Sequence, residues 1–464
     1  MRRGGGISSF PMETIKPNHA AASFHAVILA GGRGTRMQTD LPKLLHPIAG
    51  RPILRWVIAA ARDAGAASVT VVLPADEPRL HQLCHDVQTV VQPTPLGTGD
   101  ALRCAMPLLP TDTLPVAVIY GDTPFLQPAT LQAMTQQIAQ DNTAIVLLAT
   151  CAAEPNGYSR MVLNPQNQVL RLVEQVEATA QERALPLSFA GMMAVARHGL
   201  ADALGQIDNH NAKQEYYLTQ LVALANAAGQ TVGWSEVVEA EIMGINTQAE
   251  LAAAESLAQD RLRAQFLSAG VRIPAPSTVF FSADSVIGRG TVIEPNVVIG
   301  NGVVIGENCQ IRAFSYLEQS TLANAVEVGP FARVGPDAVL EPDVMIGNFV
   351  EVKRARLGSG VKAKHLSYLG NVTIGANSNI GAGTVVCNYN GFQKSATVIG
   401  ASAFIGSNSV LVAPITIGDG AYIAAGSTIT ESVPDNALGI GRALQTTKSD
   451  GGTRLRQKYS KKTK

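Results

Sequence analysis

The chain has few charged residues, few aromatic residues and no long apolar run. Charged residues make up 16% of its 464 positions and aromatic residues 5%, whereas a typical soluble chain has roughly 25% charged residues. Lys plus Arg and Asp plus Glu both number 36, so the formal net charge is zero. Because the chain carries no excess positive charge that would attract a polyanion, we expect no nucleic-acid partner. No apolar run reaches the roughly 20 residues of a membrane span, so we expect no membrane partner.

The cysteines are too scattered to form a disulfide framework. The pattern is typical of reduced thiols and predicts a cytoplasmic protein. Residues 1–24 contain arginines without the apolar segment of a signal peptide. We expect them to be a disordered extension, or the chain to start at Met12. The cysteines are five in number and include no CxxC pair: Cys84, Cys104, Cys151, Cys309 and Cys387.

A six-residue repeat dominates the second half of the chain. A branched apolar residue recurs at every sixth position, which is the period of neither a strand nor a helix. Each unit predicts one short strand and one corner, and stacked units place the apolar residues on the axis of a β-solenoid. The repeat runs in four registers: Ile287, Ile293, Ile299, Ile305, Ile311 and Leu317; Val328, Val334, Leu340, Ile346 and Val352; Ile374, Ile380 and Val386; and Ile399, Ile405, Leu411, Ile417, Ile423 and Ile429.

Glycine often follows the apolar residue of the repeat. We expect these glycines to provide the unusual backbone angles that a tight turn needs. The six-residue step is broken between Val386 and Ile399, which predicts that residues 388–397 loop out of the coil. The glycines in question are Gly288, Gly300, Gly306, Gly347, Gly375, Gly381, Gly400, Gly406 and Gly418.

Strand-like apolar stretches alternate with helical stretches in the first half. Residues 26–30 form an apolar run that leads into the glycine-rich segment 31–37. The alternation predicts a mostly parallel, helix-covered sheet, and such sheets bind ligands at the carboxyl ends of their strands. The other predicted elements are strands at 69–73, 116–120 and 145–149 and a helix at 53–64.

The glycine-rich segment carries the residue types of a phosphate site. Glycines let backbone N–H groups approach phosphate oxygens, and Arg33 and Arg36 can add charge-assisted contacts. The alternative is a glycine-rich turn with surface arginines, because the GxGxxG fingerprint is not met. Three neighbouring motifs favour the phosphate site: Leu41-Pro42-Lys43, Leu96-Gly97-Thr98-Gly99 and Tyr120-Gly121-Asp122.

A stretch rich in Ala, Glu, Leu and Arg predicts a helix that links two domains. Thr247 and Glu250 have the spacing of a capping box at its start. Gly270, followed by Pro274, marks its end. We therefore place a domain boundary in this stretch.

The order of these motifs resembles that of one enzyme family. From about Ala26 to Arg442 the chain is similar to the bifunctional N-acetylglucosamine-1-phosphate uridylyltransferases and glucosamine-1-phosphate N-acetyltransferases. The resemblance implies an α/β fold, with a Rossmann-like nucleotidyltransferase domain followed by a left-handed parallel β-helix of hexapeptide repeats. Besides the repeat, the motifs that carry it are Leu29 to Met37, Lys43, Gln92, Leu96 to Gly99, Tyr120 to Asp122, Glu215 to Tyr217 and Gly244 to Asn246.

The resemblance also implies how the chain is divided. It predicts a nucleotidyltransferase domain at 25–246, a linker helix at 247–270, an acetyltransferase β-helix at 271–445 and a basic tail at 446–464. In the family the coil forms trimers and the acetyl site is shared between chains. We therefore expect a homotrimer.

In that family the second domain transfers an acetyl group from acetyl-CoA to glucosamine 1-phosphate. The first domain then joins the product to UTP and releases pyrophosphate, which completes UDP-N-acetylglucosamine for cell-wall synthesis. We expect Mg²⁺ as the metal, and UTP and acetyl-CoA as cosubstrates. An alternative is that only one half-reaction is active and the other domain serves as a scaffold.

The resemblance assigns residues to the uridylyl site. Arg36 and Lys43 would act on the phosphates, while Asp122 and Asn246 would hold Mg²⁺, which takes few protein oxygens. Taken singly, Asp122 could be only a turn former and Asn246 only a neighbour of the helix cap. By resemblance Gln92, Gly97 and Thr98 would bind the uracil. The full set of implied substrate-binding residues is Leu29, Gly32, Lys43, Gln92, Gly97, Thr98, Tyr120, Gly121, Ser159, Glu174, Phe189 and Asn246.

A second set of candidate residues lies in the coil. Acetyl transfer to an amine needs a base, and His has an unperturbed pKa near neutrality, so His365 is the candidate. The alternative is a solvated corner histidine. By resemblance Glu351 would orient His365. The family's sugar-phosphate residues match Lys353, Tyr368 and Asn379, and its acetyl-CoA residues match Ala382, Asn388, Tyr389, Ser407, Ala425 and Arg442.

The chain departs from the family pattern at several site positions. Asp100 replaces the usual His after the LGTG motif, Phe189 replaces an Asn that binds the sugar, and Gly335 replaces an Arg that grips the sugar phosphate. Arg333 lies two residues earlier, which keeps the face of a strand but moves the side chain by roughly 7 Å. Loss of a charge-assisted phosphate contact would cost about 1.5 to 3 kcal/mol of binding energy.

Overall fold

The protein is described by a computed structural model that covers residues 24–460, apart from 33, 139–141, 152–157, 175–177, 212 and the side chain of Thr35. Residues 1–23 of the expected extension at 1–24 and Arg33 of the glycine-rich segment lie outside the described residues, whereas Phe24 is buried in the first strand. The chain divides into two compact units, Met1–Ala258 and Gln259–Lys464.

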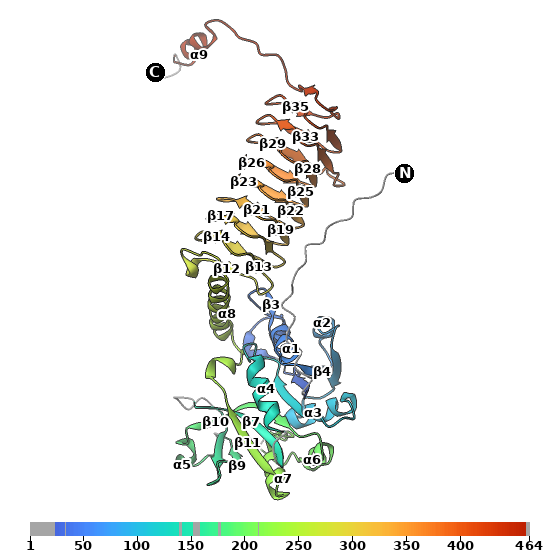
Figure 1. The fold of residues 1–464 in the computed structure, drawn as a ribbon, viewed down its shortest axis with the longest axis vertical. Helices are drawn as coiled ribbons and strands as arrows, with labels where there is room; N and C mark the ends of the chain where they lie inside the picture. The colour runs from blue at the N-terminus through green and yellow to red at the C-terminus, as the bar shows by residue number, and fades with distance from the viewer. Residues whose placement is uncertain are drawn as a thin grey trace. The chain divides into compact units, whose positions relative to one another are not determined.

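The first unit is built on one mixed sheet of nine strands (Figure 1). Its main order is β11-β7-β10-β6-β1-β4-β5, and the hairpin β8–β9 joins it at β10. Strand β1 pairs in parallel with β4 and β6, β4 with β5, and β7 with β11. The strands are β1 Phe24–Leu29, β4 Ala66–Pro74, β5 Gln88–Gln92, β6 Val116–Tyr120, β7 Thr143–Cys151, β8 Arg160–Leu163, β9 Val169–Val173, β10 Leu187–Val195 and β11 Thr231–Glu236.

Helices pack against this sheet through apolar faces. In α1 (Ile53–Asp63), Leu54, Val57 and Ile58 recur at helical spacing and are buried. The helix packs on β4, whereas α3 (Thr98–Ala105) packs on β1, β4 and β5. The other elements are α2 Pro78–Leu83, α4 Pro128–Gln137, α5 Ala180–Arg183, α6 Leu200–Gln206, α7 Gln220–Ala227, the hairpin of β2 Pro47–Ile48 and β3 Arg51–Pro52, and 3-10 turns at Thr35–Met37, Lys43–Leu45, Met106–Leu108 and Glu239–Glu241.

The strands and the helix predicted between residues 26 and 149 are confirmed, and the sheet is mostly parallel as expected, because only β10 of its main order runs against the other strands. Strand β10 runs antiparallel to both β6 and β7. A parallel return needs a crossover, usually a helix of some length. Between β7 and β10 the described residues form the hairpin β8–β9 and the four-residue helix α5 instead. The sheet is therefore mixed.

The parallel strands β6, β1, β4 and β5 bring three sequence motifs to one edge of the sheet. Leu29 at the end of β1 pairs with Tyr120 at the end of β6, and Pro74 of β4 pairs with Gln92 at the end of β5. The carboxyl ends of these strands therefore lie together, and the loops that follow them can share one ligand.

The long helix α8 (Gln248–Ser268) begins with the predicted capping box. Glu250 accepts a hydrogen bond from the backbone N–H of Thr247 at 2.9 Å, and the Thr247 hydroxyl accepts one from the backbone N–H of Glu250 at 3.2 Å. The helix ends before Gly270, whose φ of 86° is the left-handed conformation of a helix C-terminus. The boundary between the two units falls within α8.

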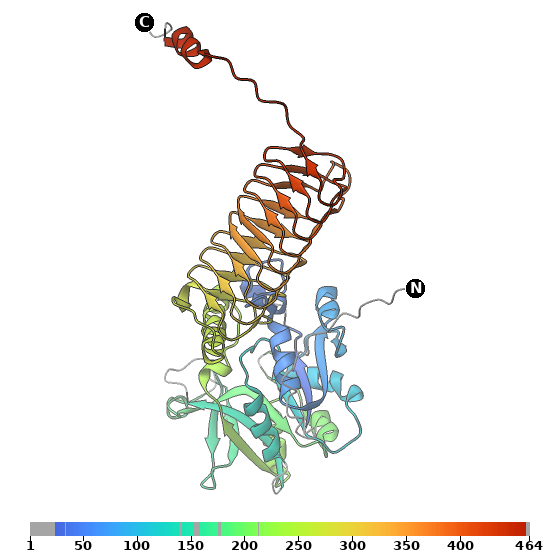
Figure 2. The ribbon, with the colours of Figure 1, turned by 45° about the horizontal axis from the view of Figure 1, so that its top comes forward.

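The second unit is a β-helix whose stacked coils are clearest in Figure 2. Each coil contributes one short strand to each of three parallel sheets, named here I, II and III. Sheet I contains β12 Phe280–Phe281, β15 Val298–Ile299, β18 Tyr316–Leu317, β21 Arg333–Val334, β24 Glu351–Lys353, β27 Tyr368–Gly370, β30 Val385–Cys387, β33 Val410–Val412 and β36 Thr428–Ile429.

Sheets II and III repeat the same arrangement. Sheet II contains β13 Val286–Ile287, β16 Val304–Ile305, β19 Ser320–Leu322, β22 Ala338–Leu340, β25 Ala355–Leu357, β28 Val372–Ile374, β31 Thr397–Ile399 and β34 Ile415–Ile417. Sheet III contains β14 Val292–Ile293, β17 Gln310–Ile311, β20 Glu327–Val328, β23 Met345–Asn348, β26 Lys362–His365, β29 Asn379–Ile380, β32 Phe404–Ile405, β35 Tyr422–Ile423 and β37 Leu438–Gly439. A 3-10 turn at Pro276–Thr278 precedes the coils, and α9 (Gly451–Ser460), which has no buried residue, follows them.

The apolar residue of every hexapeptide unit lies inside the coil. All the residues of the four predicted registers are at most 8% exposed. Their neighbours on the same short strand point outward, as Val304 does beside Ile305. The predicted burial of the repeat is therefore confirmed.

The glycines that follow these residues have a different role from the one expected. None of the nine has a positive φ. A Cβ at Gly306 would lie 2.8 Å from the carbonyl carbon of Ala323, and one at Gly347 would lie 1.9 Å from the carbonyl oxygen of Lys364. These glycines therefore allow one coil to approach the backbone of the next. The left-handed corners come three residues after the buried residue, for example at Asn296 and Asn308.

We expect Gly347→Ala to destabilise the β-helix. Because the added methyl group would overlap backbone rather than a movable side chain, the free energy of unfolding should fall by about 1 to 3 kcal/mol. The control is Gly205→Ala in α6, where nothing lies within 4 Å of the added atom. Urea unfolding followed by circular dichroism measures both variants, and equal midpoints would contradict the backbone-contact explanation.

Candidate functional sites

A pocket of about 270 Å³ lies at the carboxyl edge of the first unit's sheet. It is open to one side and mixes apolar walls with a few charged groups. Such concave, partly apolar sites are typical of small-molecule binding. Its lining residues are Leu29, Ala30, Gly31, Gly32, Lys43, Leu44, Gln92, Pro95, Gly97, Thr98, Ala101, Tyr120, Asp122 and Glu215.

Most residues predicted for the uridylyl site meet at this pocket. The backbone N–H of Gly121 donates to the carbonyl of Leu29 at 2.9 Å, which ties the β6 end to the β1 end. Sequence reasoning assigned no role to Glu215, although its motif, Glu215 to Tyr217, was recognised. The predicted residues that line the pocket are Leu29, Gly32, Lys43, Gln92, Gly97, Thr98, Tyr120 and Asp122.

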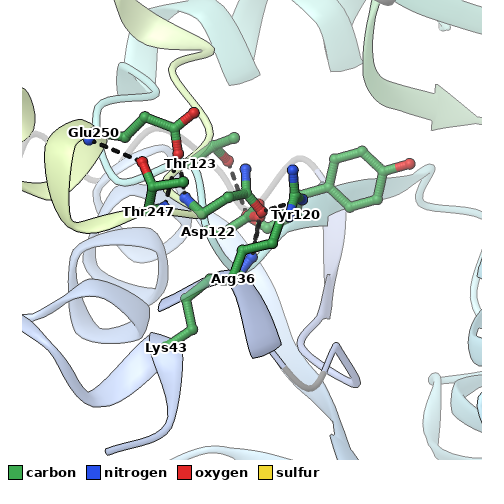
Figure 3. Close-up of polar contacts among 8 residues, drawn as sticks. Arg36, Lys43, Tyr120, Asp122, Thr123, Thr247 and Glu250 are labelled. Atoms are coloured by element: carbon green, nitrogen blue, oxygen red, sulfur yellow. Dashed lines mark hydrogen bonds and ion pairs between the residues drawn. The ribbon is translucent and has the colours of Figure 1, made fainter. Parts of the chain in front are cut away.

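Two side-chain oxygens and two cationic side chains converge at one end of the site (Figure 3). Lys43 Nζ donates to Asp122 Oδ2 at 2.6 Å and to Asn246 Oδ1 at 3.1 Å. Arg36 donates to the same Asn246 oxygen at 2.8 Å. The Lys43 side chain is 10% exposed and that of Asp122 is 21% exposed. Because little water reaches the pair, its electrostatic interactions are strengthened.

Asn246 is held in place by the cap of α8. Glu250 accepts a hydrogen bond from its backbone N–H at 2.7 Å, and the N–H of Ile245 donates to the carbonyl of Asp122 at 3.1 Å. The Thr123 hydroxyl donates to the Tyr120 carbonyl at 2.8 Å and orders the turn after β6 (Figure 3). The turn after β6 and the cap of α8 are thus both formed. Together they bring the side-chain oxygens of Asp122 and Asn246 to the same ammonium group of Lys43.

Tyr120 forms a half-buried wall of the pocket. Burial, with the nearby carboxylates of Asp122 and Glu174, raises the pKa of Tyr120 to about 12. Its hydroxyl therefore stays neutral near pH 7 and can donate a hydrogen bond. A Cβ at Gly191 would lie 2.4 Å from the ring, so that position has room for no side chain.

Three other residues predicted for the uridylyl site, Ser159, Glu174 and Phe189, do not line the pocket. Phe189 is 5% exposed and belongs to the hydrophobic core between β10 and its neighbours. Ser159 is buried, and Glu174 is half-buried. Of these, Glu174 interacts electrostatically with Tyr120, which faces the pocket.

The segment around Tyr216 shapes the glycines of the LGTG motif. Its N–H donates to Leu96 at 2.7 Å, and its carbonyl accepts from the N–H of Gly99 at 2.8 Å. A Cβ at Gly97, whose φ is 111°, would lie 2.7 Å from the Tyr216 carbonyl oxygen. The glycines therefore allow a close backbone approach beside the pocket.

In the β-helix, four predicted residues form a column along the corner between sheets III and I. His365, Ala382, Ser407 and Ala425 each follow a buried residue of sheet III by two positions. Backbone hydrogen bonds join the coils at this corner, from Gly383 to His365, from Asn408 to Ala382 and from Gly426 to Ser407. Successive members are therefore one strand spacing apart, about 4.8 Å.

The side chain that orients His365 differs from the one expected. Its Nδ1 lies 2.7 Å from Oδ1 of Asn348, the residue paired with it on the preceding coil. The amide oxygen accepts the Nδ1 proton, which leaves Nε2 free to accept another. Glu351, the predicted partner, pairs with Tyr368 across sheet I. The length of one coil could have identified Asn348, because it is the residue that pairs with His365 on the preceding coil.

The remaining acetyl-site candidates lie on neighbouring surfaces. Lys353 pairs with Gly370, over which the Tyr368 hydroxyl lies. Asn379 is on β29 of sheet III. Arg442 turns back toward Gly426, whose Cβ position is 3.8 Å from the arginine Cδ.

The predicted loop does leave the coil. Asn388 at its start is 7% exposed and donates to Asn371 at 3.0 Å. Tyr389 bridges to Lys394 across the loop, and Phe392 at the tip is 95% exposed. The interruption of the repeat is thus confirmed as a projecting loop.

Gly335 has a conformation that a larger residue would find costly. Its φ is 121°, and a Cβ there would lie 1.8 Å from the carbonyl oxygen of Glu318. Arg333 lies on the outer face of sheet I, in register with Glu351, and pairs with Glu318 at 3.0 Å. Arg333, which could replace the missing arginine, is therefore on the same sheet as Lys353, but its guanidinium already pairs with the carboxylate of Glu318.

The comparisons with known proteins match both units. A family of MobA-like NTP transferase domains matches residues 26–221, and a bacterial transferase hexapeptide family matches residues 284–319 and 396–431. The chain is thus a transferase with a nucleotidyltransferase domain and a left-handed parallel β-helix of hexapeptide repeats, and the predicted fold class is confirmed.

Curated relatives cover nearly the whole chain. A protein of Zymomonas mobilis named "Bifunctional protein GlmU" is 42% identical over 95% of this chain and 99% of its own length. Proteins of the same name from Sphingopyxis alaskensis and Paramagnetospirillum magneticum are 45% and 41% identical over 94% and 96% of this chain, and over 97% and 99% of their own lengths. The chain belongs to the GlmU family of bifunctional proteins, as the sequence predicted.

The described residues contain neither a candidate membrane-spanning helix nor a cluster of metal-binding side chains. No helix among them is both long enough and apolar enough to cross a bilayer. No three His, Cys, Asp or Glu side chains among them gather into a metal-binding group.

We expect Glu250→Ala to loosen the cap that holds Asn246. The variant leaves the N–H groups of Asn246 and Thr247 without their acceptor, so the first unit should lose about 1 to 2 kcal/mol of stability. Glu250→Gln is the control, because it keeps an accepting oxygen and should lose less. Thermal unfolding compares the two, and an alanine variant as stable as the parent would contradict this role.

Proposed function

We propose that the protein acetylates glucosamine 1-phosphate with acetyl-CoA and then couples the product to UTP, releasing pyrophosphate. The observation that carries the proposal is the meeting of Lys43, Asp122 and Asn246 at the end of a pocket that follows a glycine-rich segment. That arrangement suits a reaction in which negative charge accumulates on phosphates. Membership of the GlmU family supports it.

At the uridylyl site the chain mainly binds, orients and neutralises charge. We propose that Gly32, Arg36 and Lys43 hold the phosphates, because backbone N–H groups and cations both attract phosphate oxygens. The sugar phosphate oxygen would attack the α-phosphorus while pyrophosphate leaves. The other proposed substrate contacts are Leu29, Gln92, Gly97, Thr98, Tyr120, Gly121, Ser159, Glu174, Phe189 and Asn246.

Asp122 and Asn246 fit Mg²⁺ by their chemistry. Both present a hard oxygen, and both oxygens already share the single ammonium of Lys43. A site with two protein ligands needs no larger cluster, since Mg²⁺ keeps waters and substrate oxygens as its other ligands. When bound, Mg²⁺ would neutralise charge on the phosphates.

At the acetyl site we propose His365 as the general base. The sugar amine would attack the thioester carbonyl, forming a C–N bond as the C–S bond breaks and the thiol of coenzyme A leaves. His365 Nε2 would take the proton of the amine and pass it to the departing sulfur, while Asn348 holds Nδ1. We propose Lys353, Tyr368 and Asn379 for the sugar phosphate, and Ala382, Asn388, Tyr389, Ser407, Ala425 and Arg442 for acetyl-CoA.

The domain assignment follows from the two sites. We assign uridylyl transfer to residues 25–246 and acetyl transfer to the β-helix at 271–445, with 247–270 as linker and 446–464 as tail. A homotrimer in the cytoplasm completes the proposal, and it is supported by the hexapeptide coil, a fold typical of oligomers. The second candidate, a chain with only one working half-reaction, is favoured by Gly335 and by the pairing of Arg333 with Glu318.

Asp122→Asn should abolish most uridylyl transfer. Loss of the carboxylate removes a charged oxygen from the proposed metal site, so we expect a fall of about a hundredfold or more in kcat. The assay contains UTP, Mg²⁺ and N-acetylglucosamine 1-phosphate. Acetyl transfer in the same preparation is the internal control and should be unchanged. Uridylyl transfer at the parent rate would refute the metal assignment.

His365→Ala should show the opposite pattern. Removal of the base should slow acetyl transfer by about 10²- to 10⁴-fold, while uridylyl transfer continues. Asn348→Ala, which keeps the imidazole but frees its Nδ1, should lose less activity. The assay follows release of the coenzyme A thiol from acetyl-CoA with glucosamine 1-phosphate. If the parent chain runs only one half-reaction, the single-activity alternative holds.

A further inference from the structure

The side-chain amide of Gln92 is held in one orientation at the pocket. Gln92 ends β5, lines the pocket and is 6% exposed. Its Nε2 donates to Asp100 Oδ2 at 2.7 Å and to the carbonyl of Gly97 at 3.2 Å. Both hydrogens of the amide nitrogen are thus engaged.

Asp100 decides which end of the amide faces the pocket. A carboxylate and a carbonyl can only accept hydrogen bonds, so the nitrogen of Gln92 must lie on their side. A half-turn of the amide would place Oε1 against two oxygens in a buried place, which is unfavourable. Asp100 lies in the first turn of α3, where the helix dipole favours a negative charge.

The oxygen of the amide, Gln92 Oε1, is a hydrogen-bond acceptor without a donor among the described residues. A Cβ built on Gly31 would lie 3.0 Å from Gln92 Oε1, and Gly31 lines the same pocket. An acceptor that lies at the pocket without a protein donor favours a ligand that brings an N–H group.

We propose that Asp100 is a positioning residue that makes this pocket select a base carrying an imide N–H. Uracil presents N3–H to the oxygen of Gln92, whereas cytosine presents a lone pair at N3 and is repelled. The inference rests on the proposed uridylyl transfer and deepens it: the resemblance already places Gln92 at the uracil, and Asp100 is the residue that determines which end of its amide the base meets. A site built to hydrogen-bond one group discriminates strongly against a ligand that lacks it.

The test compares Asp100→Asn with Asp100→Glu in the full-length protein. The asparagine amide can donate as well as accept, so Gln92 becomes free to turn. The ratio of kcat/KM for UTP over CTP should fall by about tenfold or more, through a higher KM for UTP and with kcat little changed. Asp100→Glu keeps the acceptor and should retain most of the preference. Cys104→Ser on the same helix, with parental preference, is the matched control.

A second probe tests the donor itself. Equilibrium dialysis should show that the parent binds UTP much more tightly than CTP or 3-methyl-UTP, which lacks the N3 proton. An unchanged UTP-to-CTP ratio in Asp100→Asn, or equal parental binding of UTP and 3-methyl-UTP, would overturn the inference. If the parent prefers UTP in binding but transfers no uridylyl group, the proposed function fails while this inference stands.

Discussion

Parallel pairing of strands aligns the ends of neighbouring strands, and each candidate site of this protein lies where such ends align. In the first unit, β6, β1, β4 and β5 end at one edge, and their loops supply the pocket. In the second unit, each coil repeats the corner of the previous one at one strand spacing, so corner residues form columns. The same backbone constraint therefore creates a concave pocket in one unit and a linear array in the other.

Much of this arrangement follows from patterns in the sequence. The period of six predicts the large buried residue of each unit, whereas the second buried position, two residues earlier at Val297 and Val303, shows no such constant residue type in the sequence. The apolar run before the glycine-rich segment likewise predicts β1 and its functional edge. The capping box at Thr247 is a local feature, and it forms as expected.

What the sequence could not predict depends on contacts between distant segments. The antiparallel direction of β10 depends on the hairpin β8–β9, whose strands gave no clear periodic signal. The glycines after the buried residues resemble turn glycines, and only the next coil reveals that they allow close backbone contact. Asn348 precedes His365 by one coil, and that coil's length determines which residue lies beneath the histidine. The motif that contains Phe189 likewise does not reveal that its side chain packs in the hydrophobic core.

The contact between coils also limits how this protein can change. Backbone hydrogen bonds join adjacent coils, and the glycines let the coils approach closely. The residues of the column from His365 to Ala425 are therefore separated by a constant distance, the spacing of one coil. A substitution in the column can change which groups a corner residue contacts, but it cannot change the distance between successive corner residues. Any ligand that lay along this column would meet corner side chains only at these intervals, so the column itself can be lengthened or shortened only by whole coils.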